Sequence, residues 1–279
     1  MEARSEEHSL SDKQFKKLCD LVYDSTGIVL AEGKRQMVYR RLMRRIRELK
    51  LKTFPEYYAL LENNDDTEWP NFLNAITTNF TSFFRENHHF EYLKSEFLPR
   101  HCREFGRDRL RVWSTASSTG EEPYSLAITL RDFYGHGVAD TDCRILATDL
   151  DTNVLETARA GIYDADRIEG LPEAVKRKNF KQRVVDGRAL VKVDQELQQL
   201  LAFKQLNLMH DWPMRGPFDV IMCRNVMIYF DKPTQAKLLN KFMRLLRPNG
   251  VLMLGHSESI AKDFSQLKSD GKTTYIKVA

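Results

Sequence analysis

Hydrophobic and polar positions follow two different periods along this chain. Before residue 76, apolar side chains recur every three or four positions, the spacing of amphipathic helices. After residue 108, short apolar runs alternate with helical patterns, which predicts strands and helices in turn. The pattern therefore predicts an all-helical N-terminal domain at residues 1–75, a linker and connecting helix at 76–108, in which the helix itself covers residues 92–104, and an α/β domain at 109–279.

The N-terminal domain carries start and stop signals for four helices. Ser11 opens a capping box, and Gly27 ends the first helix. A second helix is predicted over residues 32–49, a third follows the cap residue Thr53, and a fourth begins near Trp69. Their apolar positions are spaced to face one another, so this part is predicted to form a small helical bundle.

The α/β domain begins with a β-α-β unit. A strand at residues 110–113 leads into the small residues 114–120, and a helix can start at Glu121. A second strand, residues 145–148, ends on Asp149 at the spacing that offers a carboxylate to a ribose. The unit therefore predicts a nucleoside ligand.

The rest of the domain continues this alternation after one interruption. A short helix and an Asp186–Gly187 turn between β-rich arms predict a small antiparallel β-hairpin insertion at about residues 173–195. Further strands are predicted at residues 203–207, 218–223, 251–254 and 274–278, with a helix at 233–246. The fold class is therefore a Rossmann-like α/β domain preceded by an all-α domain.

The turn after the first strand narrows the choice of nucleoside. It lacks the G-x-G-x-x-G glycines that admit a pyrophosphate, and Glu121 and Glu122 follow its single Gly120. Two carboxylates repel phosphate but suit an ammonium or sulfonium group, and S-adenosylmethionine carries both. The alternative is a purely structural β-α turn in a protein that binds something else.

Composition is that of a globular protein. The 279 residues are 42% hydrophobic and 29% charged, and no apolar run approaches the ~20 residues of a membrane span. Residues 1–9 are too charged for a signal peptide, so we expect a cytoplasmic protein. The four cysteines form no C-x-x-C pair, which favours reduced thiols over disulfides or a zinc site.

The positive charge is concentrated in the second helix. Residues 32–52 hold nine basic and two acidic residues, a balance of +7, so the rest of a chain of net charge +4 carries 4 − 7 = −3. Five arginines lie close together in this helix: Arg40, Arg41, Arg44, Arg45 and Arg47. They form a solvated face, a nucleic-acid contact or a docking surface for an acidic protein. Tyr39 is the only aromatic side chain within the run, which disfavours stacking on single-stranded nucleic acid.

The linker is rich in hydroxyl, amide and aromatic groups. Asn79, Thr81 and Arg85 are spaced so that they can point into a cleft at the domain junction. Adjacent His88 and His89 diverge by about 100° on a helix and lack a third ligand motif, so no metal site is predicted.

A second polar cluster follows the buried strand at residues 218–223. Residues 224–230 should face the same crevice as Asp149 and Asn207, because ligands of open α/β sheets bind beyond the carboxyl ends of the strands. Ser257 lacks the G-x-S-x-G context of a nucleophilic serine, so we do not expect it to act as one.

Taken together, these motifs resemble the CheR family of chemotaxis receptor methyltransferases from Leu10 onward. Four stretches carry the resemblance: residues 77–86, 118–125, 223–230 and 255–258. It implies a class I S-adenosylmethionine-dependent methyltransferase domain. The implied reaction transfers a methyl group from S-adenosylmethionine to glutamate side chains of chemoreceptors, with S-adenosylhomocysteine as product and without a metal.

The resemblance also implies roles for individual residues. Cofactor contacts are expected from Asn79, Thr81, Arg85, Glu122, Asp149, Asn207, Leu208, Arg224 and Asn225. Arg85 and Tyr229 are the catalytic candidates, nearest the transferring methyl. A glutamate carboxylate, with a pKa near ~4.3, is already ionised at neutral pH, so the nucleophile needs no general base.

The expected partner is the cytoplasmic helical region of a chemoreceptor, docked on the five arginines of the second helix. Whether the β insertion also holds a receptor's C-terminal peptide stays open. We expect a monomer that neither binds nucleic acid nor inserts into a membrane. A nucleic-acid methyltransferase and a non-catalytic S-adenosylmethionine-binding adaptor are the alternatives.

Overall fold

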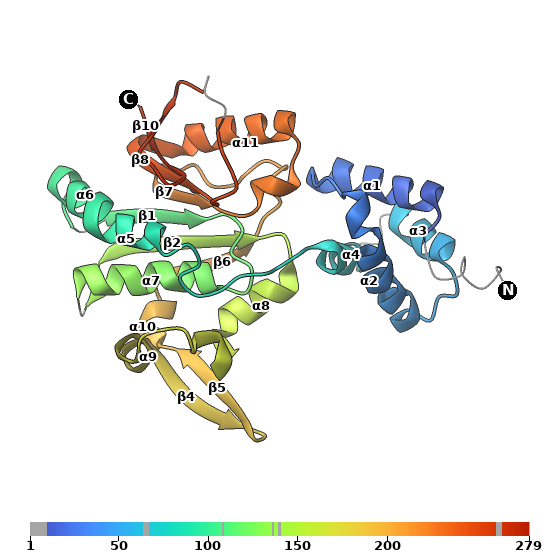
Figure 1. Cartoon of the computed structure of the whole chain (residues 1–279), viewed down its shortest axis with the longest axis horizontal. Helices are drawn as coiled ribbons and strands as arrows, with labels where there is room; N and C mark the ends of the chain where they lie inside the picture. The colour runs from blue at the N-terminus through green and yellow to red at the C-terminus, as the bar shows by residue number, and fades with distance from the viewer. Residues whose placement is uncertain are drawn as a thin grey trace.

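The computed structural model describes residues 10–63, 67–107, 109–135, 137–138, 141–260 and 264–278. They form a helical part and an α/β part joined by one extended segment (Figure 1). The charged N-terminal stretch, residues 1–9, and part of the acidic connection after the third helix, residues 64–66, lie outside the described residues.

The N-terminal part contains the predicted helices. They are α1 (Asp12–Thr26), the 3-10 turn η2 (Glu32–Lys34), α2 (Arg35–Glu48), α3 (Phe54–Glu62) and α4 (Glu68–Ile76). The Ser11 hydroxyl accepts the backbone N–H of Gln14, which completes the predicted capping box, and Gly27 ends α1 with φ of +70°.

The apolar stripes of these helices make one core. Val38, Leu42 and Ile46 on α2 are buried, as the helical spacing predicted, and they belong to the same cluster as Tyr57 of α3 and Phe72 of α4. Arginines on the remaining faces of α2 are left to solvent or to polar partners.

The connecting helix is longer than predicted. It begins at His88 rather than Tyr92, and its three pieces are α5 (His88–Tyr92), the π-helical turn η3 (Leu93–Phe97) and α6 (Leu98–Phe105). The first turn was not predicted because Asn87, His88 and His89 are polar and give no apolar helical spacing.

The α/β part is built on a seven-stranded sheet. Its strands are β1 (Arg109–Ser114), β2 (Asp142–Asp149), β6 (Leu201–Gln205), β7 (Phe218–Cys223), β8 (Leu246–Leu254), β9 (Leu267–Ser269) and β10 (Thr274–Lys277). Their order is β6-β2-β1-β7-β8-β10-β9, and the first five run parallel, whereas β10 is antiparallel to its neighbours.

Helices cover both faces of this sheet (Figure 1). They are α7 (Glu121–Tyr134), α8 (Thr152–Ala160), α10 (Gln195–Gln198) and α11 (Lys232–Leu245), with the short turn η6 at Met227–Tyr229. Alternate residues of one strand belong to different cores: Val112 joins the cluster that contains residues of α7, and Trp113 joins the cluster that contains residues of α11. This burial on both faces is why the parallel strands read as continuous apolar runs.

The predicted hairpin is part of a larger insertion. Asp186 and Gly187 both have positive φ, +49° and +74°, and join β4 (Phe180–Val185) to β5 (Arg188–Val193). A third strand, β3 (Ile162–Asp164), pairs with the other edge of β5, and η5 (Ala165–Ile168) and α9 (Glu173–Asn179) complete the unit. The insertion therefore begins at about residue 162 rather than 173, because so short a strand gives no readable alternation.

The topology places the carboxyl ends of β1, β2 and β7 side by side. The chain leaves β1 toward β2 on one side and pairs with β7 on the other, so this is the point where ligands of open α/β sheets bind. The helical part reaches the same edge: Val29 donates its backbone N–H to the Tyr229 carbonyl at 2.8 Å, and Ile28 forms an isolated bridge with Phe230.

Two composition-based predictions are confirmed by the fold. The four cysteines are all free. Within the described residues, none of the helices combines the length and the apolar character that crossing a bilayer requires.

Candidate functional site

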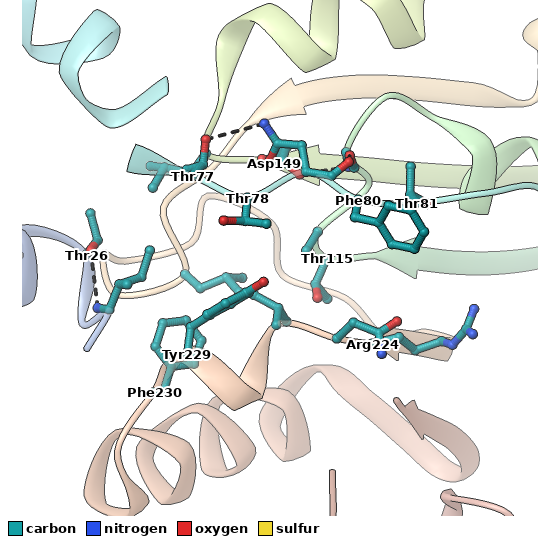
Figure 2. Close-up of a pocket in the computed structure, with 18 of the residues that line it drawn as sticks. Thr26, Thr77, Thr78, Phe80, Thr81, Thr115, Asp149, Arg224, Tyr229 and Phe230 are labelled. Atoms are coloured by element: carbon teal, nitrogen blue, oxygen red, sulfur yellow. Dashed lines mark hydrogen bonds between the residues drawn. The ribbon is translucent and has the colours of Figure 1, made fainter. Parts of the chain in front are cut away.

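A cavity lies between the helical part and the carboxyl ends of the strands. It holds about 1040 Å³ of space, part of it open to solvent. All nine residues expected to contact a cofactor line it: Asn79, Thr81, Arg85, Glu122, Asp149, Asn207, Leu208, Arg224 and Asn225. Tyr229 lines it too, across the cavity from Asp149 and Thr78 (Figure 2). The structure thus brings together side chains from five separate stretches of the sequence.

Asp149 ends β2 as the β-α-β spacing predicted. Its carboxylate accepts the backbone N–H groups of Ser118 at 2.8 Å and Asp151 at 3.0 Å, one on each oxygen. Burial raises the pKa of Asp149 to about 6, although these hydrogen bonds act in the opposite direction. Each oxygen keeps acceptor capacity, so the group can receive two hydroxyl donors from a ribose.

The two acids after Gly120 have different partners. Only Glu122 lines the cavity, and Glu121 is turned away into an ion pair with Arg167. The expectation that both carboxylates face a ligand is therefore wrong: the α-helical turn separates adjacent side chains by about 100°. Burial raises the pKa of Glu122, and the charge of Arg224 opposes that rise.

Arg224 links two acidic side chains and one backbone carbonyl at the cavity. Its guanidinium pairs with Glu122 at 3.1 Å and with Glu86 at 3.2 Å, and it also donates to the Arg85 carbonyl. Burial works to raise the pKa of Glu86, but hydrogen bonds from His256 and the Arg224 charge outweigh it and bring the value to about 2. The two glutamates therefore already balance the positive charge of Arg224 before any ligand binds.

The segment from Asn79 to Glu86 is shaped by positive backbone φ. Phe84 and Glu86 have φ of +52° and +55°, and the Phe84 N–H is held by the Ser125 hydroxyl at 2.9 Å. This folds Arg85 toward the cavity, where it donates to the Phe80 carbonyl at 2.9 Å. Among the described residues Arg85 has no carboxylate partner, so its charge is available to a ligand.

Asn79 and Asn207 line the cavity and form hydrogen bonds to residues outside it. Asn79 donates to Asp151 at 2.7 Å, and Asn207 donates to the Ser25 carbonyl of the helical part at 2.7 Å. The Asn207 amide oxygen accepts the Met209 N–H, which positions the loop that carries Leu208. These side chains shape the wall of the cavity and leave it largely apolar at Leu208.

Glu258 is a site residue whose role was missed from sequence. Its buried carboxylate accepts the N–H groups of Gly255 at 2.6 Å, Asn225 at 2.9 Å and Ile228 at 3.2 Å. It therefore fixes Asn225, with φ of +57°, and the turn that carries Tyr229. Residues 255–258 were part of the family resemblance and a nucleophilic role for Ser257 was not expected, but the structural role of the acid Glu258 was not predicted.

The helical part supplies one wall of the cavity, and none of the residues of that wall was predicted from the sequence. The wall residues are Thr26, Ile28, Leu30, Lys34 and Ile76. Figure 2 shows Thr26 at the edge of the cavity, on the side of the N-terminal helices. Since both parts are needed to enclose the cavity, neither part alone makes the site.

The five arginines of α2 that were expected to dock the receptor divide into two groups. Arg40, Arg44 and Arg47 are exposed. Arg41 donates to the carbonyls of Ala75 and Thr77, and Arg45 pairs with Glu68. The grouping of all five into one docking surface is therefore too broad: two of them hold α2 against α4 and the start of the linker.

One group of potential metal ligands occurs among the described residues. Side-chain atoms of Glu86, His88 and His89 lie within 4.8 Å of one another. The Arg224 guanidinium already pairs with this Glu86, and burial followed by the Arg224 charge lowers the pKa of His89 to about 3. A cation there would meet a fixed positive charge.

The residues fit S-adenosylmethionine. Asp149 offers acceptors to the ribose hydroxyls, Glu122 offers a negative charge to the ammonium, and Leu208 offers an apolar wall. A mostly parallel sheet with one antiparallel strand, carrying this set of groups at its switch point, defines an S-adenosylmethionine-dependent methyltransferase.

Comparison with known families makes the assignment specific. The family model described as "CheR methyltransferase, all-alpha domain" matches residues 13–77, and "CheR methyltransferase, SAM binding domain" matches residues 79–276. The chain belongs to the CheR methyltransferase family, and its cofactor is S-adenosylmethionine. The resemblance stated from the four motifs is confirmed.

Individual relatives extend over nearly the whole chain. A chemotaxis protein methyltransferase of Salmonella typhimurium is 45% identical over 96% of this chain and 91% of its own length. A chemotaxis protein methyltransferase of Klebsiella aerogenes is 47% identical over 95% and 90%. Chemotaxis protein methyltransferase 2 of Pseudomonas aeruginosa is 45% identical over 97% and 95%.

Proposed function

We propose that the protein transfers the methyl group of S-adenosylmethionine to glutamate side chains of membrane chemoreceptors, as a protein-glutamate O-methyltransferase in sensory adaptation. One observation carries this proposal: the helical part that closes the cavity also presents exposed Arg40, Arg44 and Arg47 on α2. A basic helix face beside a methyl-transfer cavity suits a substrate rich in carboxylates. The names of the relatives, which place them in chemotaxis, agree with it.

The chemistry needs no proton transfer. A lone pair of the glutamate carboxylate forms the new O–CH₃ bond, the CH₃–S bond breaks, and its electron pair stays on sulfur. The products are a glutamate methyl ester and S-adenosylhomocysteine, and the sulfonium charge and the carboxylate charge cancel. Because the nucleophile is already ionised, neither a general base nor a metal ion is required.

Arg85 and Tyr229 are proposed to act on this step. Arg85 would orient the carboxylate through hydrogen bonds, and Tyr229 would fix the second oxygen or line the path of the methyl group. The pKa of Tyr229 is raised, chiefly by burial, so its hydroxyl stays a neutral donor at physiological pH. Orientation of this kind can supply up to roughly 7 to 11 kcal/mol of rate enhancement in ideal cases.

The proposed contacts with the cofactor are assigned to residues that line the cavity. Asp149 is proposed to bind the ribose, Glu122 the ammonium and Leu208 the adenine, while Asn79, Thr81, Asn207, Arg224 and Asn225 shape the surrounding wall. Arg85 would serve cofactor and substrate together.

Docking on α2 is proposed to use the three exposed arginines only. The cytoplasmic helices of a receptor bear glutamates, so a basic helix can align with them and set their register against the cavity. We propose that the protein acts on the receptor in the cytoplasm and as a monomer.

The β insertion offers a second contact. Within the described residues β4 has a free edge, and Val184 and Val185 are 76% and 48% exposed on it. An extended receptor C-terminal peptide could add a strand to that edge. This contact would tether the enzyme without taking part in methyl transfer.

The test compares substrates under one set of conditions. Labelled S-adenosylmethionine is incubated with the protein and either a soluble fragment containing chemoreceptor methylation helices or RNA. Label on the fragment and none on RNA supports the proposal. Label on RNA would instead identify a nucleic-acid methyltransferase, and cofactor binding without transfer to either would identify an adaptor.

A further inference from the structure

The proposed reaction places two carboxylates in one cavity. One belongs to the methionine part of S-adenosylmethionine, and the other to the substrate glutamate. Each needs a positive partner if it is to leave water without a large cost. The cavity must therefore supply two cations that are not already neutralised.

Three cationic side chains line the cavity: Lys34, Arg85 and Arg224. Arg224 is excluded because Glu86 and Glu122 already balance its charge. Among the described residues, Lys34 and Arg85 have no carboxylate partner. Two carboxylates therefore face two available cations, one from each part of the protein.

Lys34 lies beside Tyr229, one of the two residues proposed to act on methyl transfer. Its Nζ stands 4.3 Å from the centre of the Tyr229 ring, and the Arg85 charge also acts on Tyr229. Lys34 precedes α2, so it is anchored to the helix whose exposed arginines are proposed to dock the receptor. Burial, with the charge of Arg41 as a second cause, lowers the pKa of Lys34, and an anion bound beside the ammonium group would oppose both effects.

We propose that Lys34 supplies the positive charge that binds the carboxylate of the substrate glutamate and holds it against Tyr229, so that Arg85 helps to orient this carboxylate while its charge balances the carboxylate of the cofactor. This inference rests on the proposed glutamate substrate and names a contact that the helical part makes in the active site. A glutamate on a helix docked along α2 reaches the cavity beside Lys34, so docking and carboxylate capture come from one element. An ammonium is a compact point charge, which positions a carboxylate without the bidentate grip that would quench its nucleophilicity.

The test uses Lys34→Met, which keeps the aliphatic stem over Tyr229 and removes the charge. Steady-state methyl transfer to a soluble fragment with chemoreceptor methylation helices gives kcat/KM, and calorimetry with S-adenosylhomocysteine gives cofactor affinity. Lys17→Met is the matched control, because Lys17 is exposed and its Nζ stands 4.9 Å from the Tyr58 ring in the same domain, outside the cavity. Should the Met variant fold poorly, Lys34→Gln replaces it.

We expect Lys34→Met to lower kcat/KM at least about tenfold, the loss of one charged hydrogen bond. Affinity for S-adenosylhomocysteine should stay at the wild-type value, Lys34→Arg should restore much of the activity, and Lys17→Met should be as active as wild type. An unchanged kcat/KM, a parallel loss of cofactor affinity, or an equal loss in the Lys17 control would each overturn the proposal. If the wild-type protein itself forms no methyl ester on the fragment, the proposed function is wrong, whatever the Lys34 variants do.

Discussion

The acid at the end of β2 makes cofactor affinity depend on pH. The Asp149 carboxylate has a pKa of about 6, because burial opposes its ionisation. Ribose hydroxyls donate to the ionised form, so protonation competes with binding. Between pH 7 and pH 5 the ionised fraction falls about tenfold, which corresponds to about 1.4 kcal/mol of binding free energy.

The contribution of Asp149 to the stability of the fold changes with pH in the opposite direction to cofactor binding. The pKa of Asp149 is raised above the ordinary value of 3.8, so its protonation favours the folded protein. That stabilisation is fully present below 3.8 and is lost as the pH rises through about 6. Weaker binding at pH 5 would therefore reflect the site and not a loss of fold caused by Asp149.

Calorimetry with S-adenosylhomocysteine from pH 7 to pH 5 measures the effect. Asp149→Asn should weaken binding at pH 7 by about 1 to 3 kcal/mol and make the pH dependence shallower. The pKa of Glu122 is also raised, so Glu122→Gln is used to separate its contribution to the pH dependence of binding. This variant should keep the change in affinity that comes from Asp149. A wild-type affinity that is flat from pH 7 to pH 5, or an Asn variant that binds as wild type at pH 7, would refute the reasoning.

Three further predictions concern the arginines. Arg85→Ala should lower kcat at least about tenfold with little change in thermal stability, since Arg85 has no ion pair within the described residues; a variant that unfolds early but keeps its rate would mark Arg85 as structural. Exchange of exposed Arg44 and Arg47 for glutamate should raise KM for the receptor fragment and flatten its salt dependence, with S-adenosylhomocysteine affinity unchanged; wild-type efficiency at low salt would leave α2 without a docking role. Arg45→Met should instead lower the free energy of unfolding in urea by about 1 to 3 kcal/mol, because it removes the cation that pairs with the buried Glu68 carboxylate, which keeps its hydrogen bond from Tyr57; an unchanged midpoint would contradict this assignment.

Local sequence signals were sufficient where the determining contacts are short-range. The capping box at Ser11, the left-handed Gly27 and the Asp186–Gly187 turn are each defined within a few residues, and all three have the predicted geometry. The strand that ends on Asp149 was readable for a similar reason, since burial on both faces leaves a continuous apolar run.

Long-range contacts account for what the sequence left undetermined. The division of the α2 arginines depends on Glu68 and on linker carbonyls that only the packed helices bring near. Lys34 reads as one more charge in a basic run until the fold sets it over Tyr229. Likewise, two of the backbone hydrogen bonds to Glu258, from Asn225 and Ile228, join segments some thirty residues apart, so no local pattern predicts them.

The claim that the substrate is a glutamate carboxylate has one direct test. A receptor fragment is incubated with the protein and S-adenosylmethionine, digested, and its peptides are examined by mass spectrometry before and after mild alkali. The account predicts a mass gain of one CH₂ group per site, localised to glutamate side chains, that alkali removes with release of methanol. A mass gain that survives alkali, or one localised to another residue type, would contradict it.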